Sequence, residues 1–332
     1  MNAPRKKTVL VIGGAGYIGS VLVGQLLASG YRVRVLDALF YDNEAALAAY
    51  RADAAFEFIR GDFRDQSAVD RAVSGADSVV LLAALVGDPL CRRHPDLARD
   101  INDVGTTQLI DKLTGRGLER LVFMSTCSNY GLRTTDEEAV ETSELKPQSL
   151  YAETKVKIER HLLESAGRSD FHPVILRCAT AYGQSPRMRL DLTVNEFTYE
   201  LAAGHELVVY DADTWRPYCH VADISGAITT VLEASVDEVS GEVFNVGRSG
   251  ENYTKRMLVD ILLGLLPDAA VRYREGSVDP RNYRVSFDKM ATRLGFAGNR
   301  NIPKTIRELL YTFRDVAVGL VDKSKPFHSN IL

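Results

Sequence analysis

The sequence has few cysteines, and their spacing is unsuited to a disulfide framework or a metal site. Only four occur among 332 residues, and none forms a CxxC pair. They are Cys91, Cys127, Cys178 and Cys219. Because structural zinc sites and disulfide scaffolds show paired or clustered cysteines, we expect no metal, no disulfide framework and a reducing, cytoplasmic location.

The chain also lacks a large excess of charge of either sign. Its formal net charge is −4, so there is no broad basic field of the kind that nucleic-acid binders use. Nucleic acid is therefore not an expected partner. The length is sufficient for one large or two smaller domains, and the sequence contains no internal repeat and no low-complexity linker.

A long uninterrupted apolar segment is missing as well. The basic stretch "PRKK" precedes "TVLVIGGAGYIGSVLVGQLLASG", a combination that mimics a signal peptide or a membrane span. Glycines at positions 13, 14, 16, 19 and 24 interrupt this segment. We therefore interpret it as a strand, a loop and a helix, and expect neither a targeting segment nor a membrane partner.

Short apolar runs alternate with helical patterns from Thr8 onward. These runs are "TVLVIG", "RVRVLD", "FEFIRGD", "SVVLLAAL", "RLVFMST", "FHPVILRCATAYG" and "EVFNVG". Continuous runs of Val, Ile and Leu are typical of strands buried on both faces. Their alternation with helices predicts an α/β fold with a Rossmann-type, doubly wound parallel sheet.

The pattern changes after Gly183, where the sequence becomes more polar and mixes helices with short strands. We predict a Rossmann domain over residues 1–180, with returning pieces near 215–247. Residues 181–214 and 248–332 are predicted to form a smaller C-terminal α+β substrate lobe. Ligands of open α/β folds bind at the carboxyl edge of the sheet, which this lobe would cover.

The stretch "VLVIGGAGYIGS" sets Gly13, Gly16 and Gly19 between a strand and a helix. This pattern permits a tight turn, close approach of a pyrophosphate and packing of the helix on the strand. Asp37 follows Gly19 by eighteen residues, at the end of the next strand. An acid there accepts hydrogen bonds from ribose hydroxyls and repels a 2′-phosphate. The two residues after Asp37 offer no arginine, so the sequence predicts NAD rather than NADP.

A tyrosine and a lysine stand four residues apart in "SLYAETKVKIERHLLE". At this spacing Tyr151 and Lys155 share one face of a helix. A neighbouring cation stabilises a phenolate, which a tyrosine needs in order to move protons near neutral pH. Taken alone, the same spacing also occurs on ordinary surface helices.

Eight motifs together resemble the extended short-chain dehydrogenase/reductases. They are "GGAGYIG", "RGDFRD", "LLAAL", "INDVGT", "MSTCSNYG", "YAETK", "LRCATAYG" and "WRPYCHVADI", in the order seen in that family. The chain is most similar to the branch of nucleotide-sugar epimerases, dehydratases and decarboxylases that includes UDP-glucose 4-epimerase. The resemblance covers most of the chain and weakens after Gly247.

The resemblance implies a set of residues that contact NAD. Asp62 would hydrogen-bond the adenine ring, and Lys155 would hold the nicotinamide ribose. Without the resemblance, Asp62 would be an ordinary turn aspartate and Asn102 a structural amide. The implied cofactor residues are Gly13, Gly16, Tyr17, Ile18, Gly19, Asp37, Asp62, Phe63, Ala83, Ala84, Asn102, Tyr151 and Lys155.

The resemblance also implies three catalytic residues, Thr126, Tyr151 and Lys155. Thr126 lies four residues before Tyr130 of the "YG" element, and its hydroxyl would donate a hydrogen bond to a sugar oxygen. Tyr151 would take the hydroxyl proton, while Lys155 would lower the pKa of Tyr151.

The two residues after Thr126 separate the possible reactions. Dehydratases of this branch carry carboxylates there, whereas this chain has Cys127 and Ser128. The resemblance, together with this difference, therefore implies an NAD-dependent nucleotide-sugar epimerase that acts at C4. The alternatives are a 4-ketoreductase or a 4,6-dehydratase, and a non-enzymatic dinucleotide-responsive protein.

For the nucleotide diphosphate sugar, the resemblance implies that Arg216 pairs with the diphosphate. Thr180 replaces the asparagine that the family usually has in "LRxxNxYG", which leaves that contact open. The resemblance further suggests a homodimer through the helices near Asn102 and Tyr151. The implied substrate residues are Ser128, Thr180, Asn195, Arg216 and Arg281.

Overall fold

The chain folds around a seven-stranded sheet in which every neighbouring pair of strands is parallel. The computed structural model describes residues 7–133, 137–276, 281–316 and 328–330. Residues 4–6 of the basic N-terminal stretch, and those parts of the two predicted domains that fall in the gaps, lie outside the described residues. The strand order is β10-β6-β5-β4-β1-β2-β3. The strands are β1 (Thr8–Ile12), β2 (Arg32–Asp37), β3 (Phe56–Arg60), β4 (Ser78–Leu81), β5 (Arg120–Thr126), β6 (His172–Cys178) and β10 (Glu242–Val246).

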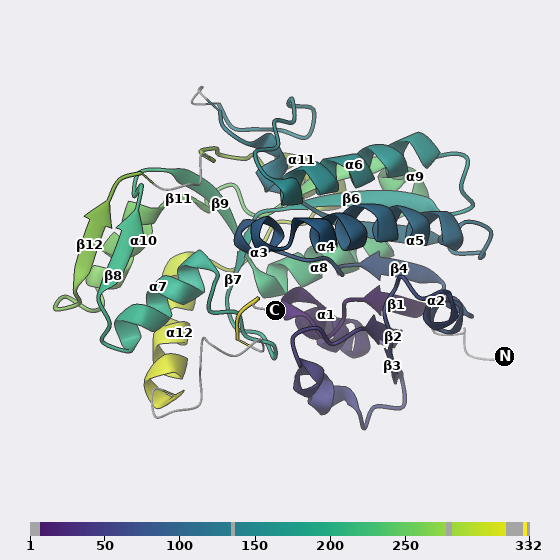
Figure 1. The fold of residues 1–332 in the computed structure, drawn as a ribbon, viewed down its shortest axis with the longest axis horizontal. Coiled ribbons are helices and arrows are strands. Elements are labelled where there is room, and N and C mark those ends of the chain that lie inside the picture. Colours follow the sequence, from purple (N-terminus) through teal and green to yellow (C-terminus); the bar gives the residue numbers. More distant parts are fainter. Residues whose placement is uncertain (1–6, 134–136, 277–280, 317–327, 331–332) are drawn as a thin grey trace.

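Helices cover both faces of this sheet (Figure 1). One face packs against α1 (Tyr17–Ala28) and α8 (Val221–Glu233). The other packs against α2 (Gln66–Val73), α5 (Thr106–Leu113) and α6 (Leu150–Ser165). Two separate apolar cores result, which confirms the predicted doubly wound α/β fold. The shorter helical segments are η1 (Glu44–Tyr50), α3 (Asp88–Arg93), α4 (Pro95–Arg99), η2 (Asp100–Gly105), η3 (Cys127–Tyr130) and α9 (Val236–Val239).

Local sequence explains where several of these elements lie and begin. All five residues of β1 are buried, as expected for a central strand covered on both faces. Ser149 and Asp65 precede α6 and α2, and their side chains accept hydrogen bonds from the backbone N–H groups of Ala152 and Ser67. Such N-cap bonds satisfy donors that have no partner within the helix. The cap at Ser149 thereby fixes the start of the helix that carries Tyr151.

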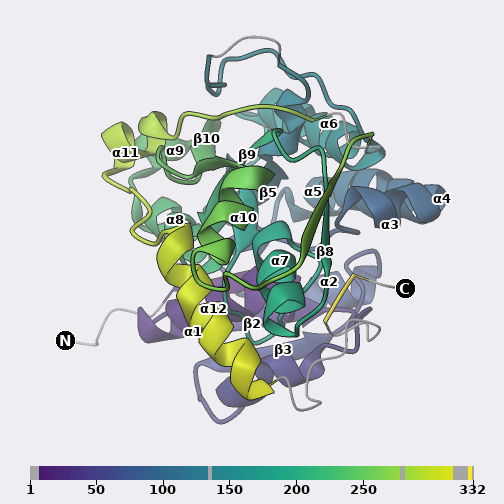
Figure 2. The same cartoon turned by 90° about the vertical axis from the view of Figure 1, so that its left-hand side faces the viewer.

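The remaining elements gather at one end of the sheet, where Figure 2 shows α7, α10 and α12 towards the viewer. Their strands form a three-stranded sheet in the order β11-β9-β7 and a two-stranded sheet of β12 and β8. A third apolar core joins them. These elements are β7 (Thr180–Tyr182), α7 (Thr193–Ala202), β8 (Leu207–Tyr210), β9 (Trp215–His220), β11 (Asn252–Thr254), α10 (Lys255–Leu263), β12 (Val271–Arg274) and α12 (Ile302–Val316). Helix α11 (Asp288–Leu294) instead packs on the large sheet beside β10.

The chain crosses between these two regions more than once. β9 belongs to the small three-stranded sheet, whereas α8 and β10, which follow it, return to the large sheet. The domain boundaries given above remain a prediction. Among the helices in the described part of the chain, none has the length and apolarity that a membrane crossing requires.

Candidate active site

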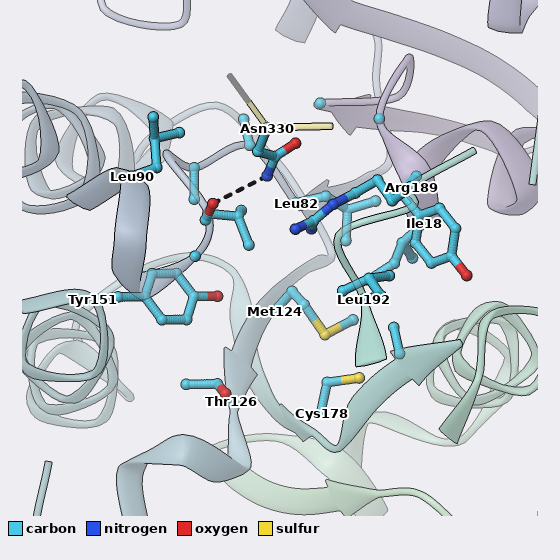
Figure 3. Close-up of a pocket in the computed structure, with 18 of the residues that line it drawn as sticks. Ile18, Leu82, Leu90, Met124, Thr126, Tyr151, Cys178, Arg189, Leu192 and Asn330 are labelled. Carbon is cyan, nitrogen blue, oxygen red and sulfur yellow. Dashed lines mark hydrogen bonds between the residues drawn. The ribbon is translucent and has the colours of Figure 1, made fainter. Parts of the chain in front are cut away.

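A cavity of about 760 Å³ lies where the carboxyl ends of the parallel strands face the smaller region. Gly13 follows β1, Asp37 ends β2, Ala83 follows β4 and Thr126 ends β5, and all four line this cavity. Figure 3 shows the part around Tyr151, Met124 and Thr126. The strand order reverses between β1 and β4, so the cavity occupies the crevice at which open α/β sheets bind nucleotides.

The glycine-rich turn between β1 and α1 has the form that a dinucleotide needs. Gly13 has a φ of +89°, and a Cβ there would lie 2.6 Å from the backbone nitrogen of Ala83. A larger residue would therefore clash with the segment that follows β4. Gly16 is the N-cap residue of α1 and provides no side-chain cap, which suits the approach of a phosphate to the start of the helix.

Asp37 connects this turn to the end of β2. Its carboxylate accepts hydrogen bonds from the N–H groups of Ala15 at 3.0 Å and Leu39 at 2.8 Å. Burial raises the pKa of Asp37, while these two N–H groups oppose the rise. Nearby, Asn43 Oδ1 is buried against the cavity and has no hydrogen-bond partner within the described residues. The turn, the acid and this unpaired acceptor fit an adenosine ribose and a pyrophosphate.

Thr126, Tyr151 and Lys155 meet on the opposite side of the cavity. Lys155 Nζ donates a 2.7 Å hydrogen bond to the carbonyl oxygen of Met124 and lies 5.8 Å from the centre of the Tyr151 ring. Thr126 Oγ1 accepts a hydrogen bond from the N–H of Ser128 at 3.1 Å. The hydroxyl proton of Thr126 can therefore be donated to a ligand.

Burial dominates the electrostatics of the pair. Burial raises the pKa of Tyr151 well above its usual value, Cys91 and Asp88 raise it further, and Arg189 opposes the rise. Burial also lowers the pKa of Lys155 to about 8, against the attraction of Glu159. The net pKa of Tyr151 is therefore raised, because desolvation of the phenolate dominates. The contribution of Lys155 to this pKa remains a prediction.

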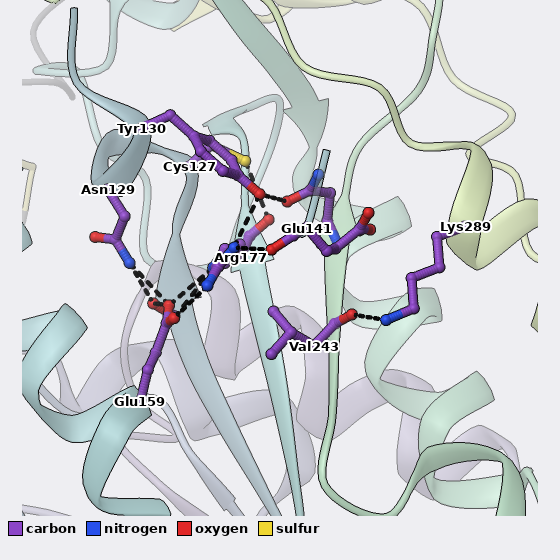
Figure 4. A network of polar contacts seen from close by, with 10 residues as sticks. Cys127, Asn129, Tyr130, Glu141, Glu159, Arg177, Val243 and Lys289 are labelled. Carbon is purple, nitrogen blue, oxygen red and sulfur yellow. Dashed lines mark hydrogen bonds and ion pairs between the residues drawn. The ribbon is translucent and has the colours of Figure 1, made fainter. Parts of the chain in front are cut away.

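A buried polar network fixes the backbone on both sides of Thr126 (Figure 4). The Glu159 carboxylate of α6 accepts hydrogen bonds from the Ser125 hydroxyl and, at 2.8 Å, from Asn129 Nδ2. Arg177 of β6 pairs with the same carboxylate at 2.7 Å and donates to the Tyr130 hydroxyl at 3.1 Å. Glu159 lies one helical turn after Lys155, so one helix positions both the lysine and the threonine segment.

The substrate side of the cavity contains Ser128 and two arginines. Arg281 Nη1 donates to Ser128 Oγ at 3.0 Å. Arg216 Nη1 donates to the backbone oxygen of Arg281 and, at 2.8 Å, to that of Trp215. The indole of Trp215, the single tryptophan of the sequence, lies 5.2 Å from the guanidinium carbon of Arg284. Two guanidinium groups at one end of the cavity suit the oxygens of a diphosphate.

All but two of the site residues predicted from the sequence line this single cavity. Asn102 is instead buried behind it, with its amide bonded to the backbone N–H and carbonyl of Leu85 at 2.7 and 2.9 Å. Asn195 is fully buried, accepts from the N–H of Gly183 and donates to the Tyr17 hydroxyl. In this structure both amides hold loops that border the cavity.

Several lining residues were missed by the sequence analysis. Arg187 and Arg189 enter from the segment between β7 and α7, and Arg189 forms a bidentate pair with Asp191 at 2.9 and 2.6 Å. Asn330, near the C-terminus, accepts from Arg187 and donates to the backbone oxygen of Val86 (Figure 3). The run "SPRMRLD", which begins two residues after Gly183, was the available signal for the two arginines.

The cysteines and acidic residues show no metal-binding arrangement among the described residues. All four cysteines are free and buried. Cys127 points away from the cavity and bonds the backbone oxygen of Arg177 at 3.1 Å. Burial holds the pKa of its thiol well above the usual range, so Cys127 does not supply an acid or a base to the cavity.

The fold and the site define a dinucleotide-dependent enzyme of the Rossmann type. More specifically, the chain belongs to the NAD dependent epimerase/dehydratase family, whose characteristic sequence matches residues 9–247. This membership confirms the predicted family, the enzyme class and NAD as the cofactor.

Known relatives include both epimerases and dehydratases. The chain is 30% identical to dTDP-glucose 4,6-dehydratase of an Actinoplanes species, covering 92% of this chain and 97% of the relative. It is 28% identical to UDP-glucose 4-epimerase of Corynebacterium glutamicum, covering 92% and 95%. The structure of Thermus thermophilus UDP-glucose 4-epimerase in complex with NAD is similar, with a TM-score of 0.81 and 27% identity, covering 95% of this chain and 100% of that one.

Proposed function

We propose that the protein is an NAD-dependent nucleotide-sugar epimerase that acts at C4. This proposal rests on one observation. Thr126, Tyr151 and Lys155 line the same cavity as the glycine-rich turn. The family and the named epimerase relatives support it. A nucleotide diphosphate sugar would place its diphosphate towards Arg216 and its sugar towards Tyr151.

The residues of the chain account for the proton movements that this reaction needs. Tyr151 removes the proton of the C4 hydroxyl, and the Thr126 hydroxyl donates a hydrogen bond to the same oxygen. Lys155, 5.8 Å from the Tyr151 ring centre, stabilises the phenolate as the proton moves. Bound NAD supplies the acceptor and donor of hydride. Tyr151 returns the proton after the keto sugar has turned its other face towards the cofactor.

The absence of an acid or base directly after Thr126 favours epimerisation over elimination. Elimination of water requires proton removal at one carbon and protonation of a leaving hydroxyl at the next. Cys127 is buried outside the cavity, and Ser128 is engaged by Arg281. An epimerase requires neither group, because the hydride returns to the carbon and the proton to the oxygen from which each was taken.

The direct test supplies the purified protein with NAD but no reductant. The protein is then incubated separately with UDP-glucose, UDP-glucuronic acid, dTDP-glucose and GDP-mannose. Chromatography and proton NMR resolve the products. We expect the C4 epimer of at least one substrate and no net change in absorbance from NADH.

Other outcomes distinguish the alternatives. Product formation only with stoichiometric NAD(P)H consumption, on 4-keto sugar substrates, would support the ketoreductase. Loss of water would support the dehydratase. Binding of NAD without turnover of any nucleotide sugar would support the non-enzymatic function.

We also propose that the chain is a cytoplasmic homodimer that associates through α6 and the adjoining η2. Val104 of η2 is 47% exposed, so an apolar side chain faces outwards beside α6. A shallow hollow on the outer face of α6 lies between Glu153, Lys157 and His161. Multi-angle light scattering of the wild type and of Val104→Glu tests the dimer: the variant should shift towards the monomer.

The proposed cytoplasmic location is supported by the four free cysteines, which suit a reducing compartment.

A further inference from the structure

The cavity contains a carboxylate that the proposed reaction does not use. Asp88 is the first residue of α3 and lies in the segment that follows β4. Its side chain lines the same cavity as Tyr151 and Ser128 and is only 13% exposed. Sequence motifs gave no indication of this placement, because Asp88 lies far along the chain from the catalytic residues.

One oxygen of this carboxylate is held by an arginine. Asp88 Oδ2 lies 2.9 Å from Arg281 Nη1, and the same nitrogen donates to Ser128 Oγ at 3.0 Å. The Tyr283 hydroxyl lies 3.5 Å from that serine oxygen. Asp88 thus balances the charge of Arg281, and the two side chains form part of the cavity wall where the substrate would bind.

The other oxygen is ready to accept a hydrogen bond. Asp88 Oδ1 is buried and has no partner within the described residues. A buried acceptor without a donor is unfavourable and is rare in folded proteins. Because this oxygen belongs to a group that lines the cavity, a donor on the ligand is the natural partner.

A sugar hydroxyl meets this requirement, whereas a sugar carboxylate does not. A hydroxyl donates to a carboxylate oxygen, and the hydrogen bond is strengthened by the acceptor's charge. A uronate would instead bring a second negative charge next to Asp88. It would also compete for Arg281, which Asp88 already pairs.

We propose that Asp88, positioned by Arg281, accepts a hydrogen bond from a sugar hydroxyl and makes the site selective for neutral hexoses over uronates. This inference rests on the proposed nucleotide-sugar function and names the substrate class of the same site. Asp88 is a specificity-determining residue, and Arg281 positions it.

The test compares UDP-glucose with UDP-glucuronic acid on the NAD-loaded protein. We expect the wild type to favour UDP-glucose in kcat/KM by about tenfold or more, the range expected for a hydrogen bond to a charged group. Asp88→Asn removes the charge and should bring the ratio towards one, chiefly by raising the KM for UDP-glucose. Asp88→Glu keeps the charge but moves the carboxylate oxygen. It should therefore weaken the binding of UDP-glucose, while the site still rejects the uronate.

Asp96→Asn is the matched control, since Asp96 lies close by in α4, is exposed and does not line the cavity. It should leave the ratio unchanged. Calorimetric titration of both UDP-sugars into NAD-loaded Tyr151→Phe, with and without Asp88→Asn, measures the same preference without turnover. Thermal melting of each variant verifies folding.

The outcomes separate this inference from the proposed function. Equal use of both sugars by the wild type, or an unchanged ratio in Asp88→Asn, would overturn the role of Asp88 and leave the epimerase intact. Release of water that is abolished in Asp88→Asn would make Asp88 a catalytic base and overturn the inference. If the wild type converts neither of these sugars, nor dTDP-glucose or GDP-mannose, the epimerase proposal fails, and the ratio of the two dissociation constants decides the role of Asp88.

Discussion

Lys155 Nζ donates a 2.7 Å hydrogen bond to the backbone oxygen of Met124, which places the lysine beneath the end of β5. The same nitrogen lies 4.5 Å from the centre of the Phe123 ring. An ammonium between a carbonyl dipole and an aromatic face is held in a fixed position although it is buried. The tyrosine one turn earlier therefore has its cation in place before any ligand binds.

Tyr151→Phe should preserve the fold and NAD binding but remove the proton acceptor. Because the phenylalanine ring fills the same volume, the free energy of unfolding should change little. The value of kcat should fall by about 10² to 10⁴, the usual contribution of a positioned acid or base. Turnover assays and measurement of bound NAD check this. Activity similar to that of the wild type would show that Tyr151 is not the proton acceptor.

Stability should rise with pH through Lys155. Its pKa is lowered from 10.5 in the unfolded chain to about 8 in the folded one. Between these values the unfolded state binds more protons, so this contribution to the free energy of unfolding increases as the pH rises. Lys155→Met removes the contribution. The stability of the wild type relative to the variant should therefore grow by up to about 3 kcal/mol between about pH 8 and about pH 10.5.

Urea titrations of both proteins across that pH range measure this difference. Comparison with the variant cancels the tyrosines and other groups that titrate in the same range. A difference that stays constant or shrinks with pH would mean that folding does not lower the pKa of Lys155.

Asp37→Ala should weaken NAD binding and reduce the preference for NAD over NADP. The substitution removes the carboxylate that accepts from Ala15 and Leu39, so the glycine-rich turn loses an anchor as well as a charge. Asp37→Asn removes the charge and replaces one acceptor oxygen with an NH2 group, but it keeps the other acceptor oxygen. It should therefore lose the preference for NAD over NADP, with a smaller loss of NAD affinity than Asp37→Ala. Calorimetric titration with both cofactors decides, and tighter NADP binding to the wild type would contradict the assignment of Asp37.

Glu159→Gln should destabilise the protein and lower turnover together. Its carboxylate is 2% exposed and pairs with an arginine that is 5% exposed. Removing one charge of a buried pair leaves the other uncompensated and costs about 3 to 5 kcal/mol. Denaturant unfolding measures the loss. Asp213→Asn, which breaks an exposed pair with Arg256, is the control and should have little effect. Equal effects of the two substitutions would show that the buried network is not important for stability.

The fold could be predicted from the sequence because the signals were local. The seven apolar runs correspond to the strands of the large sheet, and each run was recognisable without knowledge of its neighbours. Burial is continuous in central strands such as β1 and β4. The glycine pattern and the Tyr151 and Lys155 spacing are also contained within short segments. Such features depend on chain geometry over a few residues, which a sequence displays directly.

The site was predicted less completely, because several of its groups depend on packing between distant segments. Arg189 and Asp88 enter the cavity from loops whose direction only the assembled fold determines. Conversely, Asn195 belongs to a motif that suggested a ligand contact, yet its amide is bonded to Gly183 and Tyr17. The net rise of the Tyr151 pKa could not be predicted, since the sequence contains the lysine but not the degree of burial.

The position of Trp215 provides a spectroscopic probe. As the only indole in the chain, it stands next to Arg216, whose guanidinium bonds the Trp215 backbone oxygen and lines the cavity. Arg284 lies over its ring, and a nearby cation changes the emission of an excited indole. Intrinsic fluorescence therefore reports from a single point at the substrate end of the cavity. Nucleotide sugars can be titrated against it without labelling, and stopped-flow recording can separate their arrival from the chemical step.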